Sequence, residues 1–127
     1  MLTESTITTM LPVRDADRAG RFYADTLGLR PTHTGPDGTR FFATGRGDAI
    51  GLRQLPDARP SDNTALSFEV ADIVGVVAEL EGRGVRFHDY DTGDFRTDHH
   101  VATVGDEKAA WFSDSEGNIL CVHQTLA

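Results

Sequence analysis

The chain carries one pattern of residues twice, and this repeat constrains its fold more than any other feature. In the first copy, alternating apolar residues at Ile7–Val13 precede Asp15, and apolar residues at helical spacing follow. In the second copy, Ala65–Val70 precedes Asp72 and another helical stripe. The two aspartates, each placed as a helix N-cap, are 57 residues apart. Such a repeat predicts two copies of one strand–helix unit.

Each predicted helix ends at a glycine, Gly28 or Gly84, and three further strands follow it. The predicted strands are Arg30–Thr34, Thr39–Thr44 and Ala49–Leu55 in the first copy, and Val85–Asp89, Lys108–Ser113 and Asn118–Gln124 in the second. The sequence therefore predicts an α+β fold with two tandem βαβββ modules, about 5–56 and 64–127, joined by a linker at 57–63. We expect one domain, 1–127, in which the modules form a curved mixed β-sheet cup.

The two copies differ in length at one place. Gly28 and Gly47 are 19 residues apart, whereas Gly84 and Gly117 are 33 apart, so the second module carries 14 more residues. The extra segment includes the polar stretch 91–100. It is either a surface excursion or a wall or lid over a site, and its unrepeated position favours the lid.

Composition excludes several classes of protein. Hydrophobic residues make up 39% and charged residues 25% of the chain, which is typical of a globular domain and not of a disordered one. The net charge of −8, without a basic stripe, counts against nucleic acid and anionic membrane as partners. The sequence has no apolar run near the ~18 residues that span a bilayer and no signal peptide, so we expect a cytoplasmic protein.

Two motifs resemble a known superfamily. They are Val13-Arg14-Asp15 leading into a helix with Phe22-Tyr23 and Leu27-Gly28, and Trp111-Phe112-Ser113-Asp114-Ser115-Glu116-Gly117-Asn118-Ile119. The first resembles the opening module of the vicinal oxygen chelate (VOC) superfamily, the glyoxalase, bleomycin-resistance and extradiol dioxygenase group. The second resembles its closing strand–turn–strand. The resemblance covers residues 7–124 and implies the paired βαβββ fold, which hosts both enzymes and plain binding proteins.

The same resemblance implies that the superfamily's metal centre is missing. In its metal enzymes the ligands, usually His, Gln or Glu, come from the first and last strands of each module. Carried over by position, these sites fall on Thr8, Gly51, Ala65 and Cys121. These side chains do not form a hard-cation site. We therefore expect no metal and no other cofactor.

Five histidines, at positions 33, 88, 99, 100 and 123, leave one other metal site open. In an extended segment His99 and His100 point to opposite faces, so at most one would face the cup. A site built from His100 and His123 is an alternative, but no carboxylate is placed beside it. The same two histidines are the candidate acid–base residues if the chain is an enzyme.

Strand alternation predicts which side chains line the cup. Small residues at the former ligand positions would leave open volume, and Phe41 and Trp111, equivalent by the repeat, would flank it as aromatic walls. Trp111 is equally a core candidate, Arg53 either clamps an anion or pairs with Glu69, and Cys121 is expected to be an inert buried thiol. The predicted ligand-binding residues are Thr8, Phe41, Gly51, Arg53, Ala65, Ser67, Tyr90, Phe95, His100, Trp111, Cys121 and His123.

The favoured function is metal-independent binding of a small aromatic organic molecule. It resembles the drug sequestration of bleomycin-resistance proteins, a form of antibiotic resistance, and implies a homodimer and no catalysis. The alternative is a metal-free enzyme of lyase, isomerase or hydrolase type, with His100 or His123 as acid–base. A glyoxalase- or dioxygenase-type metalloenzyme is the least favoured.

Overall fold

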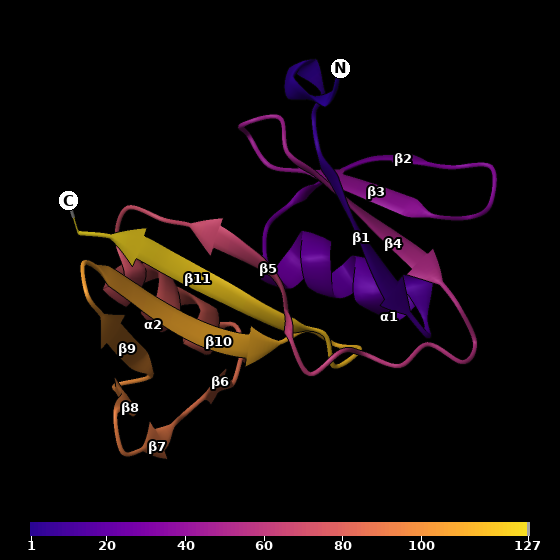
Figure 1. The fold of residues 1–127 in the computed structure, drawn as a ribbon. Helices are drawn as coiled ribbons and strands as arrows, with labels where there is room; N and C mark the ends of the chain where they lie inside the picture. Colours follow the sequence, from indigo (N-terminus) through magenta and orange to yellow (C-terminus); the bar gives the residue numbers. More distant parts are fainter. Residues whose placement is uncertain (127) are drawn as a thin grey trace. The chain divides into compact units, whose positions relative to one another are not determined.

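The computed structural model describes residues 1–126 and divides the chain into two compact units (Figure 1). The first unit is Met1–Pro60 and the second begins at Ser61, so the boundary lies inside the predicted linker. Each unit is one α+β module with its own mixed β-sheet and helix, as the repeat predicts. The cup between the two sheets stays a prediction.

Module 1 is a four-stranded sheet with a helix against it. Its elements are η1 (Leu2–Glu4), β1 (Thr8–Val13), α1 (Ala16–Arg21), η2 (Phe22–Thr26), β2 (Arg30–Thr34), β3 (Arg40–Ala43) and β4 (Ala49–Gln54). The strand order is β1-β4-β3-β2, with β1 parallel to β4 and the other pairs antiparallel. The predicted first helix is interrupted, because its second half, η2, adopts π-helical geometry.

Module 2 repeats this order. Its elements are β5 (Thr64–Glu69), α2 (Ile73–Gly82), β6 (Phe87–His88), β7 (Asp91–Thr92), β8 (Phe95–Asp98), β9 (Val101–Val104), β10 (Glu107–Ser113) and β11 (Ile119–Thr125). Strand β5 is parallel to β11, β11 is antiparallel to β10, and β6 pairs with β10. The order β5-β11-β10-β6 matches that of module 1, which confirms the duplication.

The extra segment of module 2 forms short strands and is not an irregular loop, and its role as a wall or lid over a site stays a prediction. It folds into β7, β8 and β9, which extend the sheet beyond β10. Strand β10 divides one edge between two partners, since β9 pairs with Glu107–Ala109 and β6 with Trp111 and Phe112. Strands of two to four residues are too short to show a hydrophobic periodicity that predicts them from sequence.

Both helices begin in the same way. Asp15 accepts a hydrogen bond from the Arg18 amide at 3.0 Å, and Asp72 accepts one from the Gly75 amide at 3.1 Å, which confirms both predicted N-caps. A glutamine of each module's last strand adds a second acceptor. The side-chain carbonyls of Gln54 and Gln124 accept from the first helical amide at 2.8 and 2.9 Å.

The helix side of each sheet forms the core. Tyr23 and Leu52 are fully buried in module 1, and Ile73, Phe112 and Leu120 in module 2. Both predicted helix-terminating glycines have positive φ, 75° at Gly28 and 92° at Gly84, a conformation that favours glycine. Among residues 1–126, no helix is long and apolar enough to cross a membrane.

Candidate functional site

The face of module 2 opposite its helix carries several of the predicted site residues. Along β10, Ala110 and Phe112 are fully buried on the helix side. The ring of Phe112 meets that of Phe87 edge-on, with the ring centroids 5.4 Å apart. Trp111 lies between Ala110 and Phe112 in sequence, so its side chain points to the other face, where it is only partly buried. This second face presents side chains that the core does not need.

Three aromatic rings converge on that face and form what we call the aromatic cluster: Trp111, Tyr90 and Phe95. The centroid of the Trp111 ring lies 5.8 Å from that of Tyr90 and 5.5 Å from that of Phe95, and the last two are 5.4 Å apart. All three residues are partly buried. The structure thus brings together three predicted ligand-binding residues, and Phe95 reaches the cluster because β8 folds beside β9.

Polar neighbours hold the rings of the aromatic cluster in place. The Trp111 indole Nε1 donates a hydrogen bond to Thr64 Oγ1 at 3.2 Å. His88 Nε2 lies 2.9 Å from Ser113 Oγ, and its Nδ1 lies 3.5 Å from the Tyr90 hydroxyl. These contacts fix ring orientation, which favours a preformed binding surface. Neither Thr64 nor His88 was predicted, because their contacts depend on side-chain orientation across strands.

A polar chain lies on the same face, over β5 and β11. Ser67 Oγ is 2.5 Å from His123 Nδ1, and His123 Nε2 is 3.6 Å from Glu69 Oε1. Cys121 lies between Ser67 and Trp111 in the strand register and is 5% exposed. Burial raises the pKa of the Cys121 thiol, which disfavours the reactive thiolate.

The equivalent face of module 1 is built differently. Phe41 stacks on His33 at 4.6 Å and 11°, and an added Cβ at Gly51 would lie 2.9 Å from Phe41 and 2.8 Å from Met10 Sδ. The prediction of open volume at Gly51 is therefore wrong, because Met10 and Phe41 already fill that space. Three other predicted residues, Thr8, Arg53 and Ala65, are exposed.

The donor set does not fit the superfamily's metal centre. Thr8, Gly51, Ala65 and Cys121 supply neither an imidazole nor a carboxylate, and the Cys121 thiol is held in its protonated form by burial. Within residues 1–126, no group of three or more His, Cys, Asp or Glu side chains is arranged to hold a metal ion.

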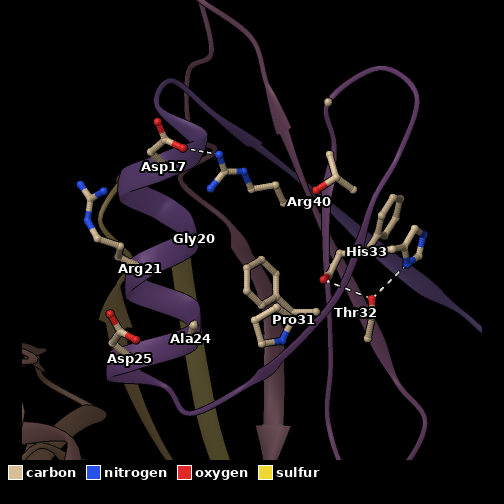
Figure 2. Close-up of a pocket in the computed structure, with 13 residues that line it drawn as sticks. Asp17, Gly20, Arg21, Ala24, Asp25, Pro31, Thr32, His33 and Arg40 are labelled. Carbon is tan, nitrogen blue, oxygen red and sulfur yellow. Dashed lines mark hydrogen bonds and ion pairs between the residues drawn. The ribbon is translucent and has the colours of Figure 1, made fainter.

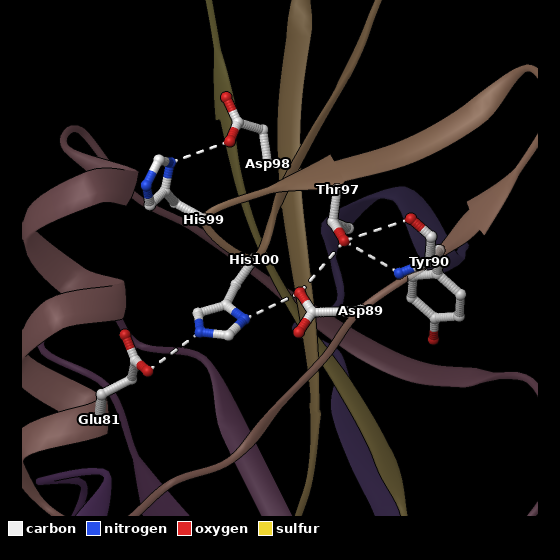
Figure 3. Close-up of polar contacts among 7 residues, drawn as sticks. All are labelled: Glu81, Asp89, Tyr90, Thr97, Asp98, His99 and His100. Atoms are coloured by element: carbon white, nitrogen blue, oxygen red, sulfur yellow. Dashed lines mark hydrogen bonds and ion pairs between the residues drawn. The ribbon is translucent and has the colours of Figure 1, made fainter.

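His100 lies apart from the aromatic cluster, on the helix side of module 2 (Figure 3). Its Nδ1 is 2.8 Å from Asp89, its Nε2 is 3.0 Å from Glu81 of α2, and its ring stacks on Phe87. The Asp89 hydrogen bond is the main cause that raises the pKa of His100. His123 points to the opposite face, since Gln124 beside it reaches the start of α2. The predicted His100–His123 pairing does not form.

Each module also has a groove on its helix side, which the sequence did not predict. In module 1 a cavity of about 620 Å³ lies between α1–η2 and β2–β3 (Figure 2). The side chain of Arg40 reaches across it to pair with Asp17. In module 2 a cavity of about 450 Å³ lies beside α2, β8 and β9. The ion pair between Arg40 and Asp17 already spans the first groove, which makes it a weaker candidate than the aromatic cluster.

Comparisons with known proteins agree with this architecture. The model of the Glyoxalase/Bleomycin resistance protein/Dioxygenase superfamily matches residues 7–122. TnmS3, an antibiotic binding protein from Streptomyces sp. CB03234, is 24% identical with a TM-score of 0.72, and 98% of each chain is covered. A glyoxalase/bleomycin resistance protein from the same organism is 25% identical with a TM-score of 0.68, covering 94% of this chain and 100% of its own.

A member of the same superfamily from Sphaerobacter thermophilus DSM 20745 is 21% identical with a TM-score of 0.77, covering 98% of this chain and 99% of its own. Among curated proteins, the search found no match.

Proposed function

The chain belongs to the glyoxalase/bleomycin resistance/dioxygenase superfamily, and we propose that it binds a small aromatic organic molecule, without a metal, against the aromatic cluster of module 2. The observation that carries this proposal is the convergence of Trp111, Tyr90 and Phe95 on the face that the helix leaves uncovered. Drug sequestration of the bleomycin-resistance type is the form of binding we favour.

The physical basis is aromatic contact with rings that are held in place. Offset or edge-to-face contact with an aromatic ligand contributes about 0.5–1.5 kcal/mol beyond the burial of area. Because the indole is already anchored to Thr64, little side-chain entropy is lost when a ligand binds. The likeness to TnmS3, which is described as an antibiotic binding protein, supports the same class of ligand.

A metal-free enzyme acting on such a molecule is the second candidate. The hydrogen bond between Ser67 and His123 favours it, because a hydroxyl beside an imidazole is a recurrent arrangement for proton transfer. Chemical analysis of the ligand after incubation separates the two functions. Sequestration returns the ligand intact, and catalysis returns it changed.

We also propose that two copies of the chain form a homodimer. All five residues of the edge strand β2 are exposed, which leaves one edge of the module 1 sheet open to another chain. Sedimentation equilibrium should give twice the 13.8 kDa mass of one chain. A mass of one chain at micromolar concentration would contradict the dimer.

Trp111 is the chain's single tryptophan, so its fluorescence reports directly on the proposed surface. We expect one member of a panel of aromatic natural products to quench it saturably at one ligand per subunit. Trp111→Ala should then weaken binding of that ligand more than tenfold in equilibrium dialysis. Val74→Ala, which trims an exposed apolar side chain beside the helix-side groove, is the matched control and should bind normally. Weak binding by the control and normal binding by Trp111→Ala would move the site to that groove.

A further inference from the structure

The polar chain Ser67–His123–Glu69 has a direction of proton donation that the proposed function does not use. The carboxylate of Glu69 lies 3.6 Å from His123 Nε2, so it favours the tautomer with the ring proton on that nitrogen. Nδ1 then carries a lone pair and accepts the hydroxyl proton of Ser67 at 2.5 Å. In that tautomer the Ser67 hydroxyl donates its proton to His123, and its remaining capacity toward a ligand is as an acceptor.

The Ser67 oxygen is available to a ligand. Ser67 is an exposed residue, whereas its partner His123 is partly buried, with 22% of its side chain exposed. The outer end of the chain is therefore an oxygen that faces outward with its own proton already donated inward. Such an oxygen accepts from an O–H or N–H donor and gives nothing to a ligand that carries only acceptors.

The polar chain and the aromatic cluster are contiguous. Ser67, Cys121 and Trp111 are register partners on the adjacent strands β5, β11 and β10. With strands about 4.8 Å apart, Ser67 lies roughly 10 Å from Trp111 along this row. The indole reaches back across β11, since its Nε1 bonds Thr64, which lies on the same strand as Ser67 and three residues before it.

We propose that Ser67 is the polar anchor of the ligand site and that it selects hydroxylated aromatics, phenols or enols, whose O–H donates to Ser67 Oγ. Glu69 is a positioning residue that acts through the His123 tautomer and does not touch the ligand. This assignment rests on the proposed aromatic binding and adds the chemical class of the ligand to it. A ligand of the same shape without the donor would stack on Trp111 and leave Ser67 unused.

The test compares 2-naphthol with 2-methoxynaphthalene, which have the same rings and differ in the hydroxyl donor. Equilibrium dialysis against the full chain should show 2-naphthol binding about five- to tenfold more tightly, the range of one net hydrogen bond. Ser67→Ala should remove this preference, so that the two compounds bind equally well. Glu69→Gln should reduce it about twofold, because the neutral amide no longer favours the tautomer.

Thr125→Ala is the matched control, since it removes an exposed hydroxyl from the same face of β11, two residues beyond His123. It should retain the full preference for 2-naphthol. Equal binding of the two compounds to the unmodified chain would overturn the anchor and leave aromatic binding standing. A preference that survives Ser67→Ala would also overturn it. Binding of neither compound would overturn the proposed function itself.

Discussion

The two modules share a scaffold and differ on one face. Their comparison separates the residues that maintain the fold from those that are free to vary. With an offset of 70, Phe42 and Phe112 occupy equivalent core positions, and Gln54 and Gln124 equivalently cap the helices. The turns Thr44–Asp48 and Asp114–Asn118 also close with the same backbone hydrogen bonds. Residues that shape the backbone are therefore repeated.

The uncovered face has diverged at positions that correspond in the strand register. The row His33, Phe41, Gly51 and Met10 of module 1 corresponds to His88, Trp111, Cys121 and Ser67 of module 2. Module 1 fills its row with a thioether and a stacked His–Phe pair, and module 2 adds Tyr90 and Phe95 to its tryptophan. A side chain on this face does not determine the fold, which leaves it free to take on binding.

The largest test of the shared scaffold is truncation of the equivalent core rings. Phe42→Ala and Phe112→Ala should each lower the free energy of unfolding by about 3–5 kcal/mol, because both rings are buried, at 3% and 0% exposure. Chemical denaturation measures the loss, and hydrogen exchange should place it in the mutated module. A cost below about 1 kcal/mol in one module would break the equivalence.

Two smaller losses of stability, with opposite physical causes, should distinguish the uncovered faces of the two modules. Gly51→Ala should cost about 1–2 kcal/mol, since the new methyl group meets Met10 and Phe41. Cys121→Ala, at the equivalent position, should cost about 1 kcal/mol for the opposite reason, the loss of a buried thiol. Adding Met10→Ala should rescue the Gly51→Ala protein in thermal denaturation. Failure of the rescue would place the strain at Phe41 alone.

The helix-capping glutamines should give matched, modest effects. Gln54→Ala and Gln124→Ala each remove one acceptor from a helical amide that is partly buried, and each should cost about 1 kcal/mol. Gln54→Glu and Gln124→Glu keep an acceptor oxygen and serve as controls. Urea denaturation that shows a cost in one module only would mean that the repeat is not energetically equivalent there.

The smallest effect belongs to the segment found in module 2 alone. The pKa of His100 lies above its usual 6.5, chiefly because of Asp89, so its protonation stabilises the fold. This contribution is complete below pH 6.5 and is lost as the pH rises through the higher pKa of the folded state. We therefore expect His100→Asn to lower the melting temperature by a few degrees near pH 6 and by less near pH 8. A difference in melting temperature that is the same at both pH values would mean that the charge on His100 does not contribute to stability.

Sequence patterns predicted the elements whose signals are local. The caps Asp15 and Asp72 and the strand Arg30–Thr34 follow from spacing within one module. The equivalence of Phe41 with Trp111 follows from the repeat between the modules. Tyr90 and Phe95 were predicted as ligand-binding residues, but their gathering around Trp111 was not predicted. It depends on a segment whose strands were not recognised from sequence.

Other features depend on packing that a linear pattern does not contain. The sequence predicted open volume at Gly51. A small residue leaves space only when no neighbouring side chain turns into it, and the Met10 side chain does so. His100 was placed in the cup, but the left-handed backbone at His99 and His100, with φ of 50° and 72°, turns it toward α2. The direction of proton donation along Ser67–His123–Glu69 could not be predicted from sequence, because it is inferred from distances between side-chain atoms.

The divided edge of β10 keeps the pairing shared by both modules apart from the pairing with the inserted strands. Strand β6 keeps the pairing that the repeat requires, and the inserted hairpins attach to a different stretch of the same strand. The pairing of β6 with β10 therefore does not depend on the residues that the insertion adds. Because the insertion delivers Phe95 to Trp111, changes in it would alter the proposed ligand-binding surface. In evolutionary or engineering terms, we expect exchange of residues 91–104 to change the proposed ligand preference while the strand order β5-β11-β10-β6 is kept.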